Sequence, residues 1–235
     1  VFSASEILGL RPTKLATIIN HLEQMYCDSI GVEYMYIRNP EEIQWWQDRL
    51  NKNDNHPSYN IDSKKYILSK LNQAVGFEDF LQTKYVGQKR FSLEGGEALI
   101  PAIAVALKDA AEKYGVKETV LGMAHRGRLS TLTNIFKKPV RDLFSEFEGK
   151  DFDDEHIDGD VKYHMGLTLS KTFKNGEVMK MNLVPNPSHL ETVAPVAQGI
   201  ARAKIDRKYN GDDSKILPII VHGDAAIAGQ GIVYE

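Results

Sequence analysis

The first third of the chain is patterned for helices. Apolar residues recur every three or four positions over residues 15–25, which places a single apolar stripe on a helix. Asn39 is a favourable N-cap in front of Pro40, a residue that is common at the first position of a helix. A third apolar stripe runs over residues 67–81. We therefore expect residues 1–84 to form a small helical region.

From about residue 85 the pattern changes to alternating helices and strands. A long amphipathic helix is expected over residues 99–114, and a short apolar strand over residues 119–124. Residues 168–183 predict a hairpin, because the central Asn-Gly pair tolerates positive φ. The aliphatic run 216–221 predicts a central strand that is buried on both faces. This order predicts an α/β domain with a parallel sheet over residues 85–235.

Composition narrows the classes of function. The 235 residues carry 29 Lys and Arg against 32 Asp and Glu, a net charge of −3, without a dense basic run. We therefore expect neither a nucleic-acid partner nor a membrane, since no apolar stretch approaches the roughly 18 residues that span a bilayer. The single cysteine, Cys27, cannot form an internal disulfide and is expected in a core. The acidic stretch 146–160 is either a cation site or, more typically, a solvated loop.

Two predicted strands deliver polar residues to the edge of the sheet where α/β proteins bind ligands. Asp224 follows the run 216–221, and a carboxylate in that place suits Mg²⁺ beside a diphosphate. A plain capping aspartate is the alternative. His125 and Arg126 follow the strand at 119–124, where Arg126 would clamp a phosphate and His125 would donate to a carboxylate. A basic surface turn is the alternative there.

Other polar motifs can be explained either by a binding function or by a purely structural role. Residues 94–97 are either an anion-binding loop or an acidic first turn of a helix. Ser188 and Glu191 have the spacing of a capping box. His164 and His189 lie beside predicted strand ends. The spacing of the seven histidines does not match a zinc motif, and the simple nucleotide-binding fingerprints are missing from the sequence.

Five motifs follow one another along the chain: FSLEGGE at 91–97, GMAHRGRL at 122–129, GDVKYHMG at 159–166, NPSHLE at 186–191 and HGDAA at 222–226. In this order they resemble the thiamine-diphosphate-dependent decarboxylase component of 2-oxoglutarate dehydrogenase complexes. The resemblance extends over nearly the whole chain.

The resemblance implies a fold and a reaction. The fold would be a parallel-sheet thiamine-diphosphate-binding domain, preceded by the small helical region. The reaction would be oxidative decarboxylation of 2-oxoglutarate in the tricarboxylic acid cycle, with thiamine diphosphate and Mg²⁺ as cofactors. The succinyl group would pass to a lipoyl group of the partner dihydrolipoyl succinyltransferase. The family further implies a homodimer, in the cytoplasm of a bacterium or in the mitochondrial matrix.

The resemblance also implies roles for individual residues. Asp224 would be a ligand of Mg²⁺, and Arg126 would contact the diphosphate. The residues that bind the cofactor would be Arg126, Ser188, Leu190, Asp224 and Ala225. The catalytic residues facing the substrate would be His125 and His164, with His189 and Arg128 as further candidates.

The chain begins at Val1 without a methionine, and we expect it to be a fragment. The resemblance implies that the remaining Mg²⁺ ligands and the pyrimidine-binding domain follow residue 235, so the domain would be incomplete and the fragment alone inactive. Ser130, Ala194 and Ile227 depart from the family pattern and leave a preference for 2-oxoadipate open. Two rival functions are a different thiamine-type or nucleotide-binding enzyme, and a non-catalytic docking module for complex assembly.

Overall fold

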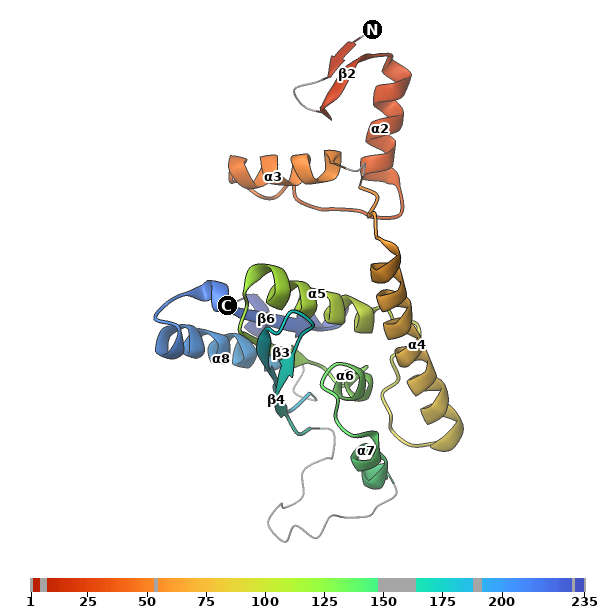
Figure 1. The fold of residues 1–235 in the computed structure, drawn as a ribbon, viewed down its shortest axis with the longest axis vertical. Coiled ribbons are helices and arrows are strands. Elements are labelled where there is room, and N and C mark those ends of the chain that lie inside the picture. The colour runs from red at the N-terminus through yellow and green to blue at the C-terminus, as the bar shows by residue number, and fades with distance from the viewer. Residues whose placement is uncertain are drawn as a thin grey trace. The chain divides into compact units, whose positions relative to one another are not determined.

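The computed structural model describes residues 2–4, 8–52, 55–147, 164–187, 192–229 and 231–234 (Figure 1). The chain divides into two compact units, Val1–Lys64 and Lys65–Glu235. This division falls inside a long helix, α4, which runs from Ile61 to Lys84. The boundary after residue 84, between the helical region and the α/β domain, stays a prediction. The acidic stretch, apart from its first residues, lies outside the described residues, as do Ser188, His189 and Leu190.

The first unit combines a small antiparallel ribbon with two helices. Strands β1, Phe2–Ala4, and β2, Leu10–Thr13, pair at its start and were not expected from the sequence. Helix α2 runs over Leu15–Cys27, and α3 over Pro40–Asn51. The Oδ1 atom of Asn39 accepts a hydrogen bond from the backbone N–H of Glu41 at 2.9 Å, which confirms the predicted N-cap.

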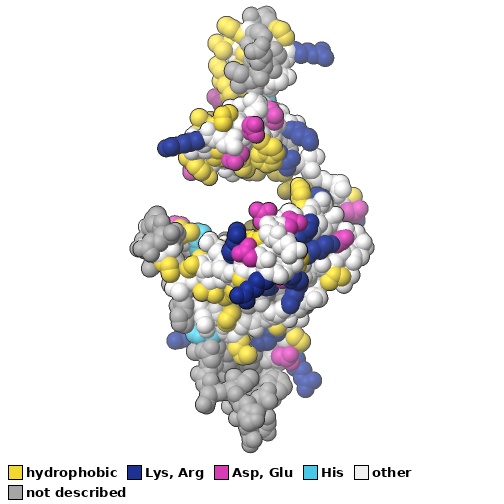
Figure 2. Space-filling model, turned by 90° about the vertical axis from the view of Figure 1, so that its left-hand side faces the viewer, with side chains coloured by type: hydrophobic (Ala, Val, Ile, Leu, Met, Phe, Trp, Pro, Cys, Tyr) yellow, Lys and Arg dark blue, Asp and Glu magenta, His cyan; other side chains and the backbone are white. Residues whose placement is uncertain are grey.

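Large apolar side chains of this unit lie both inside and on its surface. Met25, Tyr34 and Leu50 form its small core. By contrast, Met35 and Trp45 are exposed, and hydrophobic side chains are visible on the surface of the unit in Figure 2. Cys27, the last residue of α2, is exposed as well. The expectation that this cysteine fills a core was therefore wrong, because the last turn of α2 turns its side chain outward.

Helices surround the sheet of the second unit. Those before and between the strands are α4, α5 at Leu99–Tyr114, α6 at Arg128–Asn134, and α7 at Val140–Phe147. Later come α8 at Val193–Lys208, the 3₁₀ turn η1 at Asp213–Lys215, α9 at Asp224–Gly229, and α10 at Gly231–Tyr234. Across the described residues of both units, no helix is long and apolar enough to cross a membrane.

A four-stranded sheet in the order β4-β5-β3-β6 forms the centre of the second unit. Its strands are β3, Glu118–Met123; β4, Leu167–Thr172; β5, Val178–Leu183; and β6, Ile216–Val221. Strand β3 runs parallel to both β5 and β6, whereas β4 and β5 are antiparallel. The α/β prediction and the Asn-Gly hairpin are confirmed.

One prediction about the sheet was wrong. Strand β6 has the expected bounds, but it lies at an edge of the sheet rather than in its centre. Ile216 is buried, Pro218 is exposed, and the remaining residues of the strand are half-buried. A proline has no backbone N–H to donate, so it is tolerated at an edge strand. The fully buried central strand is β3, in which all six residues are buried.

Side chains alternate between the two faces of the sheet and pack into two separate cores. On one face, Leu121 and Met123 of β3 pack with buried residues of α4, α5 and α6. On the other face, Val120 packs with Val193 and Ala197 of α8. Strand β3 is thereby fixed from both sides, and the loop that follows it has a rigid base.

A buried carboxylate fixes the start of β3. The side chain of Glu118 is 2% exposed and accepts hydrogen bonds from Lys204, Lys208 and Tyr209. Burial by itself would raise the pKa of Glu118, but these hydrogen bonds outweigh burial and lower the pKa to about 2. Glu118 thus ties β3 to the C-terminal end of α8.

Candidate active site

The three parallel strands end at one edge of the sheet. Leu121 of β3 pairs with Leu183 of β5, and Met123 pairs with Val221 of β6. The segments that follow these strands therefore emerge side by side. Ligands of open α/β sheets bind at this carboxyl edge. The residues predicted after β3 and β6 come together here, as expected from the sequence.

The ring of His125 is held against an aromatic side chain. His125 is half-buried, and its ring centroid lies 4.4 Å from that of Phe91, with the planes at 48°. Phe91 adopts a φ of 45°, a left-handed conformation that is costly for a residue with a side chain. Its carbonyl oxygen accepts a hydrogen bond from Gly127 N at 3.0 Å. Phe91 thus orients His125. The spacing of apolar residues does not indicate this role, and the only hint in the sequence is that Phe91 belongs to the motif at 91–97.

Arg126 lies on the surface of the same loop. Its Nη1 donates to the carbonyl oxygen of Ser92 at 3.3 Å, and the side chain is exposed. A guanidinium carries five N–H donors, so this single bond leaves others for an anionic ligand. The phosphate-binding role of Arg126 stays a prediction.

Arg128 has a different environment from its neighbour. It is 1% exposed, and its Nη2 donates to the carbonyl oxygens of Met165 and Val184, both at 2.9 Å. Burial lowers the pKa of Arg128 to about 10, so the group remains charged at neutral pH. Arg128 is thus no surface residue; it joins the start of α6 to the segments beside β4 and β5. This geometry makes it a positioning residue.

His164 is anchored beside the end of β5. Its carbonyl oxygen accepts a hydrogen bond from Asn186 N at 2.7 Å, and its side chain is half-buried. A Cβ atom on Gly166, two residues later, would lie 2.6 Å from the carbonyl oxygen of Leu183. The segment can approach β5 this closely because residue 166 is glycine. His164 therefore reaches the same sheet edge as His125.

Strand β6 ends in His222, Gly223 and Asp224. The Nδ1 of His222 donates to the carbonyl oxygen of Gly223 at 2.9 Å, which requires the tautomer protonated at Nδ1. Asp224 and Ala225 open helix α9 and are exposed. Within the described ranges, no three acidic, histidine or cysteine side chains converge on one point. Of those residues, Asp224 is the one placed to offer an oxygen ligand at this end of β6.

A largely apolar cavity of about 410 Å³ opens beside His222, at the end of β6, and Asp224 is not among the residues that line it. It lies between the ends of β3 and β6 and the first turns of α8 and α9. Two of its lining residues, Ala194 of α8 and Ile227 of α9, are positions at which the sequence departs from the family pattern. The lining residues are Ala124, Val193, Ala194, Pro195, Gln198, Ile220, Val221, His222, Ile227 and Ile232.

The structure thus gathers one set of the predicted residues and leaves another undescribed. His125, Arg126, His164, Asp224 and Ala225 all lie at the carboxyl edge of the sheet. Ser188, His189 and Leu190 fall between the end of β5 and α8, in residues outside the described ranges, so their roles stay predictions.

Comparison with known proteins shows which family contains this arrangement. The family described as dehydrogenase E1 component matches residues 69–235. The chain belongs to this family. The match begins inside α4 and takes in every strand of the four-stranded sheet, so the carboxyl edge lies within the E1 domain.

Individual relatives match the chain over all or nearly all of its length. A 2-oxoglutarate dehydrogenase E1 component of Cupriavidus necator is 48% identical over 236 residues, covering 100% of this chain and 24% of that protein. A multifunctional 2-oxoglutarate metabolism enzyme of Mycolicibacterium vanbaalenii is 48% identical over 240 residues, with coverages of 100% and 19%. A Brucella canis 2-oxoglutarate dehydrogenase E1 component is 45% identical, with coverages of 97% and 24%. The chain spans about a quarter or less of the length of these relatives.

Proposed function

We propose that this chain is the part of a 2-oxoglutarate dehydrogenase E1 component that binds the diphosphate end of thiamine diphosphate and the substrate carboxylates. The observation that carries the proposal is the set of His125, Arg126, His164 and Asp224 at one sheet edge, in a chain 45–48% identical to proteins with that name. The reaction would be oxidative decarboxylation of 2-oxoglutarate, carried out by the complete gene product.

The chemistry of the donor set at the edge suits this cofactor. Asp224 offers carboxylate oxygens, which Mg²⁺ prefers, and Arg126 offers a planar fork of donors for a diphosphate. The adjoining cavity is largely apolar and of a size that accommodates a small heterocycle. When bound, thiamine diphosphate supplies the electron sink that decarboxylation of a 2-oxo acid requires. Ser188, Leu190 and Ala225 would complete the wall around it.

The protein's own groups would bind and orient the substrate. The imidazole N–H groups of His125 and His164 would donate to carboxylate oxygens of 2-oxoglutarate and stabilise charge that develops beside them. Phe91 fixes the ring of His125, and Arg128 fixes the backbone that carries His164, so both donors are positioned before the substrate arrives. The apolar wall of the cavity would exclude water from the reacting atoms.

The partners follow from the same proposal. The product of an E1 component of this class is a succinyl group, which a lipoyl group of a dihydrolipoyl succinyltransferase would accept. The complete protein would act as a homodimer. The transacylase partner is inferred from the names of the relatives and from the resemblance of the motifs, and the homodimer from that resemblance alone.

The test measures carbon dioxide release by the complete gene product with 2-oxoglutarate and with 2-oxoadipate. Asp224→Asn should abolish Mg²⁺-dependent binding of thiamine diphosphate, measured by tryptophan fluorescence, and should abolish turnover. Asp213→Asn is the matched control, because Asp213 is an exposed carboxylate in η1, before β6. Both activities should survive in this control.

Three further outcomes have definite meanings. A higher kcat/KM for 2-oxoadipate would assign the protein to that substrate. Binding of thiamine diphosphate without turnover of either acid would favour another thiamine-type enzyme. Absence of both binding and turnover, together with retention of the transacylase by residues 1–84, would favour a docking module and overturn the proposal.

A further inference from the structure

Helix α4 has two opposite faces. Its inner face buries Ala74, Phe77 and Leu81, which belong to the larger core of the second unit. The outer face is exposed but carries two large apolar side chains, Leu68 at 56% and Val75 at 39% exposed. These two residues are seven positions apart, so they lie almost in line along the helix. An apolar row on the side of a helix that faces away from the core is typical of a contact surface.

A row of small residues runs beside this apolar row. Ser69 and Gly76 each follow one of the apolar residues, are exposed, and are also seven positions apart. Among the described residues, none outside the turns next to Gly76 comes within 4 Å of a Cβ atom placed there. A row without bulky side chains allows another backbone to approach closely.

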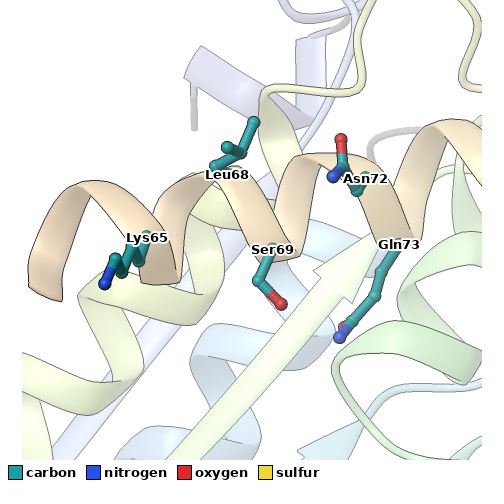
Figure 3. A pocket seen from close by; sticks show the side chains of 5 residues that line it. All are labelled: Lys65, Leu68, Ser69, Asn72 and Gln73. Carbon is teal, nitrogen blue, oxygen red and sulfur yellow. The ribbon is translucent and has the colours of Figure 1, made fainter.

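A hollow of about 440 Å³ follows the same outer face. Figure 3 shows the side chains that line it: Lys65, Leu68, Ser69, Asn72 and Gln73. In this view Leu68 and Asn72 extend to one side of the helix, and Ser69 extends to the other. Because members of both rows line the hollow, the space between the rows is open to side chains of another surface.

The outer face is arranged symmetrically about Asn72. Lys65 and Asp79 lie seven residues before and seven residues after Asn72, all three are exposed, and the two outer residues carry opposite charges. If two α4 helices cross antiparallel at Asn72, the two amides face each other. Each Lys65 then faces Asp79 of the other copy. The charges of this face are therefore complementary to the same face turned end for end.

The antiparallel arrangement matches the two rows as well. Leu68 of one copy would lie beside Val75 of the other, and Ser69 beside Gly76, because each of these pairs is centred within one residue of position 72. The apolar row would be buried, and the row of small residues would let the helices come close together. An isologous interface between identical chains requires a surface whose two halves complement each other in this way.

We propose that the outer face of α4 packs antiparallel against α4 of a second copy of this chain. The end-for-end complementarity of Lys65 and Asp79 favours a second copy over a different partner. Facing asparagine amides can hydrogen-bond to each other and fix the register of the pair, as a single asparagine does in coiled coils. The contact would form part of the homodimer proposed above; it rests on that proposal for the existence of a dimer, and not on the reaction.

Cysteine cross-linking of the complete gene product tests this pairing. Helix axes about 8–10 Å apart bring Cα atoms at the crossing point within reach of a disulfide. Asn72→Cys should therefore give a disulfide-linked dimer under mild oxidation, in a background with Cys27→Ser because Cys27 is exposed. Thr83→Cys is the matched control: it is exposed on α4, but its two copies would lie about 33 Å apart in the antiparallel pair.

The linked dimer should form at least about tenfold faster with Asn72→Cys than with Thr83→Cys, since only the first pair of thiols is held face to face. Equal rates, or no linked dimer, would overturn the proposal. If another segment of the same chain covers α4, the thiol at position 72 stays unlinked and also resists a thiol reagent, and this result overturns it too.

Reversing the charges gives a second measurement. Added to Asn72→Cys, Lys65→Glu places like charges opposite each other and should slow the linkage about fivefold. The further change Asp79→Lys restores complementarity and should return the rate to within about twofold of the starting variant. Lys84→Glu makes the same charge change at the exposed end of α4 and should leave the rate unaltered. Loss of linkage that Asp79→Lys does not rescue would contradict the predicted register.

Neither measurement depends on turnover, so this inference and the proposed reaction can fail separately. Absence of linkage in a protein that decarboxylates 2-oxoglutarate overturns the α4 contact alone. Linkage in a protein that turns over neither 2-oxo acid supports the contact and counts against the reaction.

Discussion

The hydroxyl of Ser92 donates a hydrogen bond to the carboxylate of Glu78 at 2.8 Å. Glu78 belongs to α4 and is 6% exposed, with Arg90 as a more distant partner at 3.9 Å. The same hydroxyl accepts a bond from Glu94 N at 3.0 Å, and the carbonyl oxygen of Ser92 accepts from Arg126. A carboxylate buried beneath the loop therefore positions the segment that carries Phe91 and supports the candidate active site.

Replacing the serine tests this arrangement. Ser92→Ala removes one hydrogen bond from a buried carboxylate and the acceptor of Glu94 N, so the free energy of unfolding should fall by about 1–3 kcal/mol. Ser145→Ala is the matched control: Ser145 bonds the carbonyl of Arg141 at the surface of α7, and its loss should cost under about 0.5 kcal/mol. Urea denaturation of both variants measures the difference, and equal stabilities would show that the contact with Glu78 contributes nothing.

Two features disfavour a side chain at Gly127, its positive φ and its close packing, and Gly115 shares only the first. It has a φ of 75°, and a Cβ atom there would lie 2.6 Å from Cδ1 of Leu93. Gly115 has a φ of 67°, but no heavy atom lies within 4 Å of its would-be Cβ. Gly115→Ala should thus cost only the conformational penalty, about 1–2 kcal/mol, while Gly127→Ala adds about 1–3 kcal/mol of steric strain. Thermal melting that ranks the two variants equally would refute the steric contribution.

The sequence predicts those parts of the fold that depend on local preferences. Asn39 and Pro40 start α3, and the aliphatic run 216–221 coincides with β6. The Asn175-Gly176 pair makes the hairpin, with Gly176 at a φ of 87°. Each of these signals is contained in a few consecutive residues, whose conformations are restricted by sterics or burial. The carboxyl edge was predictable for the same reason, since two strand ends and a polar residue after each define it.

Contacts between residues that lie far apart in the sequence could not be predicted from local patterns. Nothing near Glu78 in the sequence indicates that it meets Ser92, and nothing near Arg128 indicates that its side chain is buried. The edge position of β6 depends on strand order, which hydrophobicity alone does not specify.

The burial of Arg128 predicts that lysine cannot replace it. One guanidinium nitrogen bonds the carbonyls of both Met165 and Val184, a geometry that the shorter, non-planar ammonium group does not reproduce. Arg128→Lys should therefore lower the free energy of unfolding by about 2–4 kcal/mol. Arg202→Lys, in the exposed pair with Asp206, should change it by less than about 0.5 kcal/mol. A small effect at Arg128, measured by urea denaturation, would contradict its positioning role.

The buried carboxylate of Glu118 predicts a pH dependence of stability. Its pKa is about 2 in the folded chain, against an ordinary value of 4.5, so the folded state favours the ionised form. The resulting stabilisation is fully present above pH 4.5 and is lost as the pH falls from there towards 2. Two of its partners reach solvent, with Lys204 24% and Lys208 54% exposed, which reduces the expected contribution to about 1–3 kcal/mol.

Glu118→Gln tests this dependence, because glutamine keeps the shape and an acceptor but has no charge to lose. The variant should be less stable than the parent chain by about 1–3 kcal/mol at pH 6, and the difference should shrink as the pH approaches 2. Asp109→Asn, in an exposed pair with Lys113, provides a control that should change stability by less than about 0.5 kcal/mol at either pH. Urea denaturation across this pH range gives the answer: a constant difference between the parent and Glu118→Gln would mean that packing, and not the charge of Glu118, ties β3 to α8.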